Sequence, residues 1–187
     1  MKILDITLIA LFVAFMGALG LVPPIMLSFT PVPITLQTLG VLLAGGVLGA
    51  RRGAWSMIVF LLVVAAGIPL LSGGRGGIGV FVGPSAGYLL SYPLTAFCIG
   101  LLISRFHQLR LWNILLVNLT VGIFLIYLIG IPVQAFVMHI PLFKAIQLSL
   151  IYIPGDVLKA SIASYLVFRL LKSPVIYRTL QKNAETL

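Results

Sequence analysis

"LWNILLVNLTVGIFLIYLIGIPVQAFVM" (residues 111–138) contains no charged side chain. It exceeds the roughly 20 mostly apolar residues that a helix needs to cross the hydrocarbon core of a bilayer. The rest of the chain has the same character, since 61% of its 187 residues are hydrophobic and only 8% are charged. Soluble domains carry about 25% charged residues. The composition therefore indicates an integral membrane protein built from helices.

Apolar runs separated by proline, glycine or basic residues predict six transmembrane helices. The runs cover 3–22, 34–50, 54–71, 88–104, 111–138 and 147–171. We expect residues 1–187 to form one all-α transmembrane domain. The second run is short and contains Gln37 and paired glycines, so it could be tilted or broken, which leaves a five-helix arrangement open. The first run lacks the small-residue cleavage site of a signal peptide, and we expect it to be retained.

Basic residues in short loops favour the cytoplasmic side of a membrane. In the six-helix arrangement they fall at the N-terminus, in the even-numbered loops and at the C-terminus: Lys2, Arg51, Arg52, Arg105, Arg110, Lys172, Arg178 and Lys182. Trp55 and Trp112 begin the third and fifth predicted helices beside two of these loops, where interfacial indoles are expected. Both termini are therefore predicted to be cytoplasmic.

The composition also argues against several functions. The net charge of +9 fits topology and contact with anionic lipid headgroups, and no basic surface interleaved with aromatic residues suggests nucleic-acid binding. The single cysteine, Cys98, excludes an internal disulfide, and neither His107 nor His139 has a second metal ligand at suitable spacing. The chain has no G-x-x-x-x-G-K-[ST] phosphate loop, so any use of ATP requires a partner protein.

Three stretches fall on the non-cytoplasmic side in this topology: "VPPIMLSFTPVPITLQT" (22–38), "SGGRGGIGVFVGPSAGY" (72–88) and "HIPLFKAIQ" (139–147). They are longer than a plain helical hairpin needs and are rich in proline and glycine. Irregular backbone at membrane depth is tolerated where it lines a cavity. The stretches therefore predict a cavity on this side, with exposed loops as the alternative.

"GDVLK" (155–159) places Asp156 and Lys159 one turn apart on the same face of the last predicted helix. A charged side chain at a helix centre costs roughly 2.5–3.5 kcal/mol in a membrane, and less near the interface. Ionisable residues at such positions indicate a functional site by default. A structural ion pair is the alternative, whereas a proton relay is disfavoured because no second acid or histidine accompanies the pair.

Three regions resemble the BioY family, the biotin-binding substrate-specificity (S) subunits of energy-coupling-factor (ECF) transporters. They are "PVPITLQTLGVLLAGGVLGARRG" (31–53), "GIPLLSGGRGGIGVFVGPSAGYLLSYP" (67–93) and "IPGDVLKASIA" (153–163). The chain departs from the family pattern at Ser85-Ala86, where Thr-Gly is expected, and at Ser91, where glycine is common. Both departures are conservative, so they leave the assignment intact and bear only on affinity.

The resemblance implies a six-helix S subunit of a bacterial cell membrane. Such a subunit captures biotin on the outer face and docks on a transmembrane scaffold protein that carries two ABC-type ATPases. ATP is used only by these partner subunits, and the S subunit needs no cofactor. Some members are reported to act without the complete module, and the sequence leaves this point open.

The chemistry of biotin matches several of the residues noted above. Its ureido ring has two N–H donors and one carbonyl acceptor, and an unpaired buried polar group costs about 1–3 kcal/mol. We expect Asp156 to accept from a ureido N–H, and Lys159 to keep it ionised while donating to the ligand. Gln37 and Thr35 could reach the ligand from the first outer stretch. The alternative for Gln37 is a hydrogen bond between helices.

The glycine-rich stretch offers backbone N–H groups without side chains in the way, for example at Gly77 and Gly83. Ser85 would open the fourth predicted helix, where a hydroxyl and the helix N-terminus favour an anion. Tyr88 could stack on the bicyclic ring of biotin. Arg75 is the cation of this stretch and a candidate partner for the valerate carboxylate, with a solvated arginine as the alternative.

Ala10, Ala14 and Ala18 recur at every fourth position of the first predicted helix. Small residues at this spacing allow close helix contact. From the residues alone, packing within the bundle is the favoured interpretation. The resemblance implies instead that this stripe is the dock for the transmembrane scaffold.

A stand-alone, ion-coupled secondary transporter or facilitator of a small carboxylated solute is the main alternative function. Such proteins often contain inverted repeats, and none is evident between residues 1–93 and 94–187. An enzyme would require a nucleophile–base set or a metal site. The only ionisable cluster in the predicted membrane segments is one acid with one base, so catalysis is disfavoured.

Overall fold

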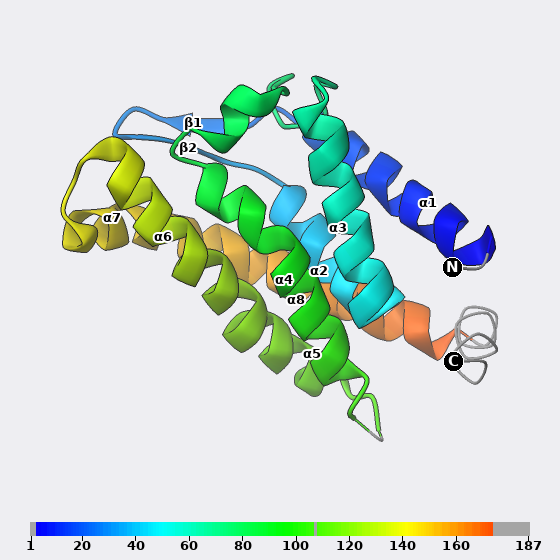
Figure 1. The fold of residues 1–187 in the computed structure, drawn as a ribbon. Coiled ribbons are helices and arrows are strands. Elements are labelled where there is room, and N and C mark those ends of the chain that lie inside the picture. Colours follow the sequence, from blue (N-terminus) through cyan, green and yellow to red (C-terminus); the bar gives the residue numbers. More distant parts are fainter. Residues whose placement is uncertain (1–2, 107, 174–187) are drawn as a thin grey trace.

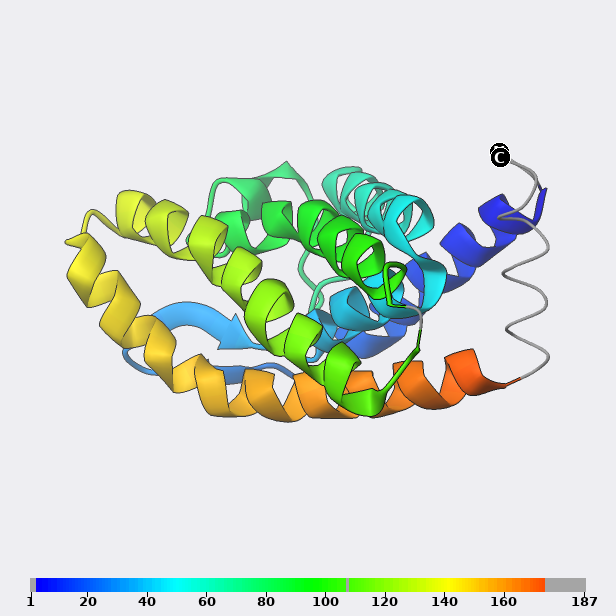
Figure 2. The same ribbon diagram turned by 90° about the horizontal axis from the view of Figure 1, so that it is seen from below.

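The computed structural model describes residues 3–106 and 108–173 as an elongated bundle of helices (Figures 1 and 2). Lys2, His107, Arg178 and Lys182, which entered the sequence argument, lie outside the described residues. The α-helices are α1 (Ile3–Gly20), α2 (Gln37–Leu48), α3 (Ala50–Ala65), α4 (Ala86–Ile103), α5 (Leu111–Val117), α6 (Phe124–Met138), α7 (Leu142–Ser149) and α8 (Ile153–Lys172).

Several of these elements join into long continuous helices. A π-helical turn, η2 (Asn118–Ile123), connects α5 to α6, and a 3-10 turn, η3 (Leu150–Tyr152), connects α7 to α8. In the described part of the chain, four helical segments are long and apolar enough to cross a membrane: Ile3–Gly20, Ala86–Ile103, Leu111–Met138 and Leu142–Lys172. The expectation of a helical membrane protein is confirmed. The count of six crossings stays a prediction, because α2 has 12 residues and rises only about 18 Å.

The last helix begins earlier than expected, because most of the expected outer loop 139–147 is helical. α6 ends where His139 adopts a left-handed conformation (φ 52°). Pro141 is the N-cap residue of α7 (φ −57°, ψ 142°), where its missing N–H removes no helical hydrogen bond. In the sequence Pro141 resembles loop punctuation, which predicts a helix start at 147 rather than at Leu142.

The fold also contains a small antiparallel sheet that the all-α expectation omitted. β1 (Ile25–Leu27) pairs with β2 (Thr30–Ile34) within the first outer stretch. The glycine-rich stretch contains a 3-10 helix, η1 (Ile78–Phe81). Figure 1 shows both segments above the main body of the bundle, at the opposite side from the connection between α4 and α5.

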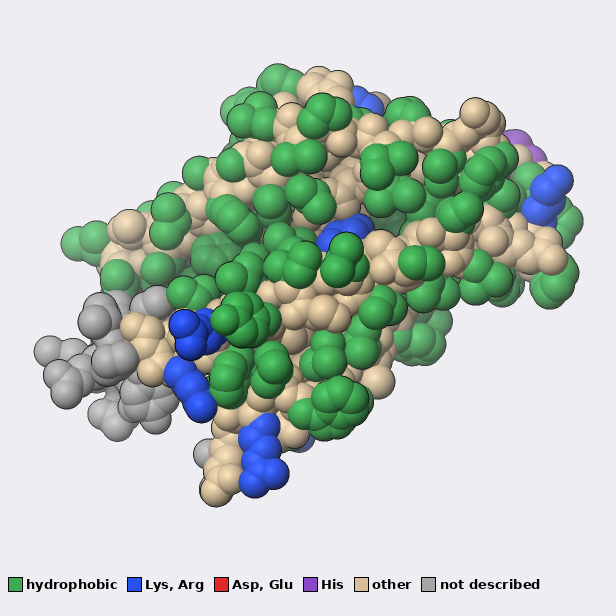
Figure 3. Space-filling view, turned by 180° about the vertical axis from the view of Figure 1, so that it is seen from behind, with side chains coloured by type: hydrophobic (Ala, Val, Ile, Leu, Met, Phe, Trp, Pro, Cys, Tyr) green, Lys and Arg blue, Asp and Glu red, His purple; other side chains and the backbone are tan. Residues whose placement is uncertain are grey.

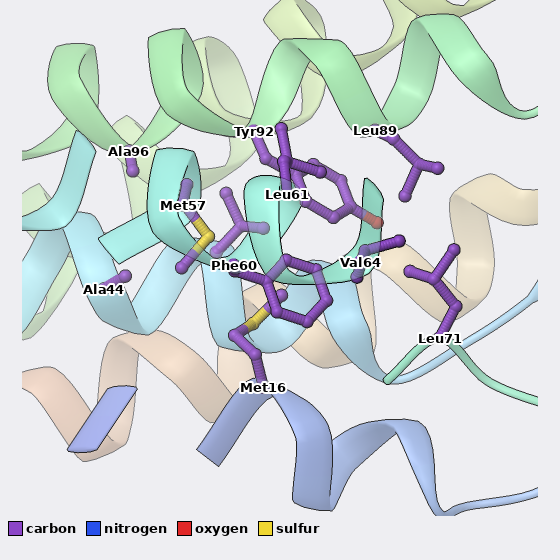
Figure 4. Close-up of a cluster of buried hydrophobic side chains, with 11 residues drawn as sticks. Met16, Ala44, Met57, Phe60, Leu61, Val64, Leu71, Leu89, Tyr92 and Ala96 are labelled. Atoms are coloured by element: carbon purple, nitrogen blue, oxygen red, sulfur yellow. The ribbon is translucent and has the colours of Figure 1, made fainter. Parts of the chain in front are cut away.

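The core is built where α1, α3 and α4 meet. Met16, Phe60 and Ala96, one from each of these helices, are fully buried and belong to a single hydrophobic cluster (Figure 4). The same cluster includes Leu71 and Tyr92, which also line the cavity described below. The packed core and the wall of the cavity are therefore continuous.

The starts of α1 and α3 are tied together by an ion pair. Arg52 Nε lies 2.7 Å from Asp5 Oδ1. The start of α1 and the end of α8 lie at the same end of the molecule in both ribbon views (Figures 1 and 2). The basic residues Arg51, Arg52 and Lys172 belong to elements that begin or end there.

Glycines allow α2, α3 and α4 to approach closely. Gly49 joins α2 to α3 with a φ of 79°, a conformation that disfavours other residues. Gly100 of α4 packs against this junction, and a Cβ at Gly100 would lie 2.2 Å from the backbone nitrogen of Ala50.

We therefore expect Gly100→Ala to lower the free energy of unfolding by about 1–3 kcal/mol, because the backbone of the α2–α3 junction would have to move. The measurement is the thermal unfolding midpoint in detergent. Gly79→Ala is the matched control, since a Cβ there meets nothing within 4 Å. Equal midpoints for the two variants would contradict the tight packing at Gly100.

Candidate functional site

A cavity opens between β2, the start of α2, the glycine-rich stretch, α4, α6 and the start of α8. Its empty volume is about 590 Å³, counting the part open to solvent. The polar and aromatic residues that line it are Thr35, Gln37, Thr38, Arg75, Ser85, Tyr88, Tyr92, Tyr127, Tyr152, Asp156 and Lys159.

Asp156 and Lys159 form an ion pair at the wall of this cavity. Lys159 Nζ lies 2.6 Å from Asp156 Oδ1, and the two residues are only 9% and 7% exposed. Asp156 occupies the first turn of α8, where the helix dipole stabilises a negative charge. The helical spacing predicted from the sequence therefore produces a buried, compensated pair.

The ammonium group of Lys159 is fully engaged by the protein. Besides Asp156, it donates to the carbonyl oxygen of Thr35 and to Thr38 Oγ1, each at 2.9 Å. These bonds use all three of its donors. Lys159 therefore holds the start of α2 against α8, and it could donate to a ligand only by releasing one of these partners.

The carboxylate of Asp156 keeps unused acceptor capacity. Tyr127 Oη donates to Oδ2 at 2.5 Å, and Thr38 Oγ1 lies 3.5 Å from Oδ1. Because each carboxylate oxygen can accept about two hydrogen bonds, Oδ2 can take a further donor. A buried carboxylate at the wall of a cavity is suited to bind a ligand N–H.

Three of the four tyrosines that line the cavity direct their hydroxyl groups to protein partners. Tyr127 donates to Asp156, as described. Tyr152 Oη lies 2.7 Å from Thr30 Oγ1 and donates to the carbonyl of Val32 at 3.0 Å, which fastens β2 to η3. Tyr88 Oη donates to Gln134 Oε1 at 2.7 Å. The rings of these three tyrosines therefore form apolar parts of the cavity wall, whereas their hydroxyl groups are hydrogen-bonded to other groups of the protein.

Seven of the residues singled out from the sequence line this one cavity: Thr35, Gln37, Arg75, Ser85, Tyr88, Asp156 and Lys159. The structure does not bring Gly77 and Gly83 to it. The backbone N–H of Gly77 donates instead to the carbonyl of Val64 at 2.7 Å. The glycine-rich stretch is bonded here to the end of α3, so this N–H is not available to a ligand.

The environments of three lining residues differ from one another. The amide of Gln37 donates to the carbonyl of Leu70 at 3.0 Å, so it also anchors the loop after α3. Ser85 precedes α4, but its hydroxyl makes no capping hydrogen bond. Arg75 is partly buried, and its Nε donates to the carbonyl of Ser72 at 3.2 Å.

Four further lining residues were not predicted from the sequence: Thr38, Tyr92, Tyr127 and Tyr152. A signal existed for the tyrosines, because a phenol hydroxyl inside an apolar helix needs a hydrogen-bond partner. Tyr92 also follows Tyr88 by one helical turn and so shares its face. Thr38 carried no comparable signal, since threonine is common in membrane helices.

The small-residue stripe of α1 is not packed inside the bundle. Ala10, Ala14 and Ala18 are all exposed, so the expectation of intramolecular packing is wrong.

Seen from behind, the surface of the protein is mostly hydrophobic (Figure 3). The Lys and Arg side chains lie chiefly towards the ends, and one lies in a hollow midway along this face.

Comparison with known proteins gives one consistent result. The family model described as the BioY family matches residues 1–174. The probable biotin transporter BioY of Bacillus subtilis (strain 168) is 51% identical over 170 residues, 91% of each chain. The biotin transporter BioY of Rhizobium etli is 46% identical over 168 residues, 87% of this chain and 90% of the relative. The solved S-component for biotin from an ECF-type ABC transporter has a TM-score of 0.88 and 35% identity, and the match covers 92% of this chain and 93% of that one.

Proposed function

Because the chain belongs to the BioY family, we propose that it is the biotin-binding S subunit of an ECF-type uptake transporter. It is a transport protein of a cell membrane rather than an enzyme. The single observation that carries the proposal is a cavity lined by a buried Asp156–Lys159 pair, in a fold that matches a biotin S-component with a TM-score of 0.88.

Hydrogen-bonding capacity suggests how biotin is oriented in the cavity. The free acceptor position on Asp156 suits a ureido N–H, which places the bicyclic ring near Tyr127 and α8. The donors of Lys159 are occupied, whereas the Nη groups of Arg75 make no hydrogen bond to the described residues. Arg75 is therefore the better partner for the valerate carboxylate, with Ser85 and Tyr88 also on the wall.

The membrane arrangement follows from charge and apolar length. We assign six crossings, with α2 and α3 as the two short ones and with both termini in the cytoplasm. The cavity then faces outward. The exposed alanines of α1 are available to a transmembrane scaffold subunit, which would carry two ABC-type ATPases, and the S subunit itself needs no cofactor.

The test is calorimetric titration of the purified protein with biotin and with biotin amide, which lacks the carboxylate charge. We expect tight one-to-one binding of biotin by the wild type. Arg75→Gln should lower biotin affinity roughly 10-fold or more, since charge-assisted hydrogen bonds contribute about 1.5–3 kcal/mol, while binding of the amide changes little.

Two results would contradict this proposal at different levels. A folded wild-type protein that ignores biotin would refute the substrate. Equal losses of biotin and biotin amide in Arg75→Gln would refute only the assignment of Arg75 to the carboxylate.

A further inference from the structure

A buried polar layer adjoins the cavity at Tyr88. It joins Tyr88 of α4, Gln134 of α6 and Ser149 of α7. Gln134 is 0% and Ser149 1% exposed, and of the three only Tyr88 lines the cavity.

The hydroxyl group of Tyr88 is held from two directions. It donates to Gln134 Oε1 at 2.7 Å and lies 3.0 Å from Ser149 Oγ. The Ser149 hydroxyl has one proton, which it can give either to Tyr88 Oη or to the carbonyl of Ala145, 2.8 Å away and one turn earlier in α7. Rotation of the phenol ring would break these contacts inside an apolar bundle, where no water replaces them.

The ring of Tyr88 is held by its neighbours as well. A Cβ at Gly130 would lie 2.4 Å from two ring carbons, so the ring packs on bare backbone of α6. The ring of Tyr127, which bonds Asp156, meets it edge-on, with centroids 6.2 Å apart at 85°. The ring of Tyr88 therefore connects the buried layer to Tyr127 and, through the hydroxyl of Tyr127, to Asp156.

Stability alone does not account for this layer. Replacing both partners of a buried hydrogen bond with apolar groups of similar shape is often nearly neutral. The layer does fix one ring at the wall of a binding cavity, and preorganised walls reduce the free energy lost in ordering a site on binding. On the basis of the proposed function, we propose that Gln134 and Ser149 are positioning residues for biotin, acting through the hydroxyl group of Tyr88.

The test compares biotin affinity and dissociation rate in Tyr88→Phe, Gln134→Leu and Ser149→Ala. Each should bind biotin about 3- to 10-fold more weakly, the range expected for one lost neutral hydrogen bond, with the change mainly in the dissociation rate. Ser149→Thr keeps the hydroxyl and should stay near the wild type.

The matched control is Ser161→Ala. Ser161 donates to the carbonyl one turn earlier, as Ser149 does, but it is exposed on α8. Its replacement should leave biotin binding unchanged.

A double-mutant cycle separates positioning from a purely structural role. If Gln134 acts through the hydroxyl of Tyr88, Tyr88→Phe combined with Gln134→Leu binds biotin no more weakly than Tyr88→Phe alone. Additive losses, or single variants with wild-type affinity, would overturn the inference while leaving the proposed function intact. A wild type that fails to bind biotin would overturn both.

Discussion

Asp156→Asn is expected to lower biotin affinity by roughly 10- to 150-fold, the equivalent of about 1.5–3 kcal/mol for a lost hydrogen bond to a charged acceptor. The asparagine has the same shape but no charge. It therefore also leaves Lys159 buried, at 7% exposure, without its counterion. Breaking a buried pair in this way destabilises a protein by about 3–5 kcal/mol, so a single variant cannot separate binding from folding.

The double variant Asp156→Asn with Lys159→Met separates these two effects. Removing the lysine charge should restore most of the lost stability, because no uncompensated ion remains. It should not restore biotin binding. The measurements are thermal unfolding in detergent and calorimetric titration on the same preparations.

Asp5→Asn is the matched control, since it removes the acid of the other described ion pair, which joins the start of α1 to Arg52 of α3. Biotin affinity should be unchanged in this variant. Wild-type affinity in folded Asp156→Asn would instead make the Asp156–Lys159 pair structural, and the ligand contacts would have to be sought around Gln37 and Arg75.

The second large effect concerns transport rather than binding. The test uses cells that also express the coupling module, that is, the transmembrane scaffold and its two ABC-type ATPases. Ala14→Trp should lower biotin uptake in these cells by at least about 10-fold, because the tryptophan overfills a close helix contact. Biotin affinity of the purified protein should be unchanged, because Ala14 is exposed on α1 and does not line the cavity.

Leu62→Trp is the control for this experiment. Leu62 is exposed on α3, so a tryptophan there adds the same side chain to the surface of a different helix. Uptake that persists in Ala14→Trp, and in cells without the module, would favour the stand-alone secondary transporter instead.

The helical membrane architecture could be predicted because the transfer of a segment into a bilayer depends mainly on the local density of apolar residues. The run 111–138 was predicted with its observed limits. The pattern does not reveal the π-helical turn inside it. The start of α7 was missed because Pro141 is compatible with both a loop and a helix start. The β1–β2 pairing depends on contacts across a turn that the prolines of this segment obscure.

Prediction of the site succeeded where a residue is unusual for its segment. Asp156 and Lys159 are conspicuous in an apolar helix, and their bond is set by spacing along that helix. The partners that complete the site are far away in the sequence. Tyr127 reaches Asp156 across 29 positions and Thr38 reaches Lys159 across 121, and no local pattern specifies such contacts.

A membrane-embedded helical protein with a charged pair one turn apart can be predicted from the residue order, because hydropathy and helical periodicity are local properties. Which polar groups meet that pair depends on how the helices pack. The same packing decides that the tyrosine hydroxyls turn to protein partners, that the N–H of Gly77 is already bonded, and that the alanines of α1 face outward. These features depend on how distant helices pack, and packing is a property of the whole bundle rather than of any one segment.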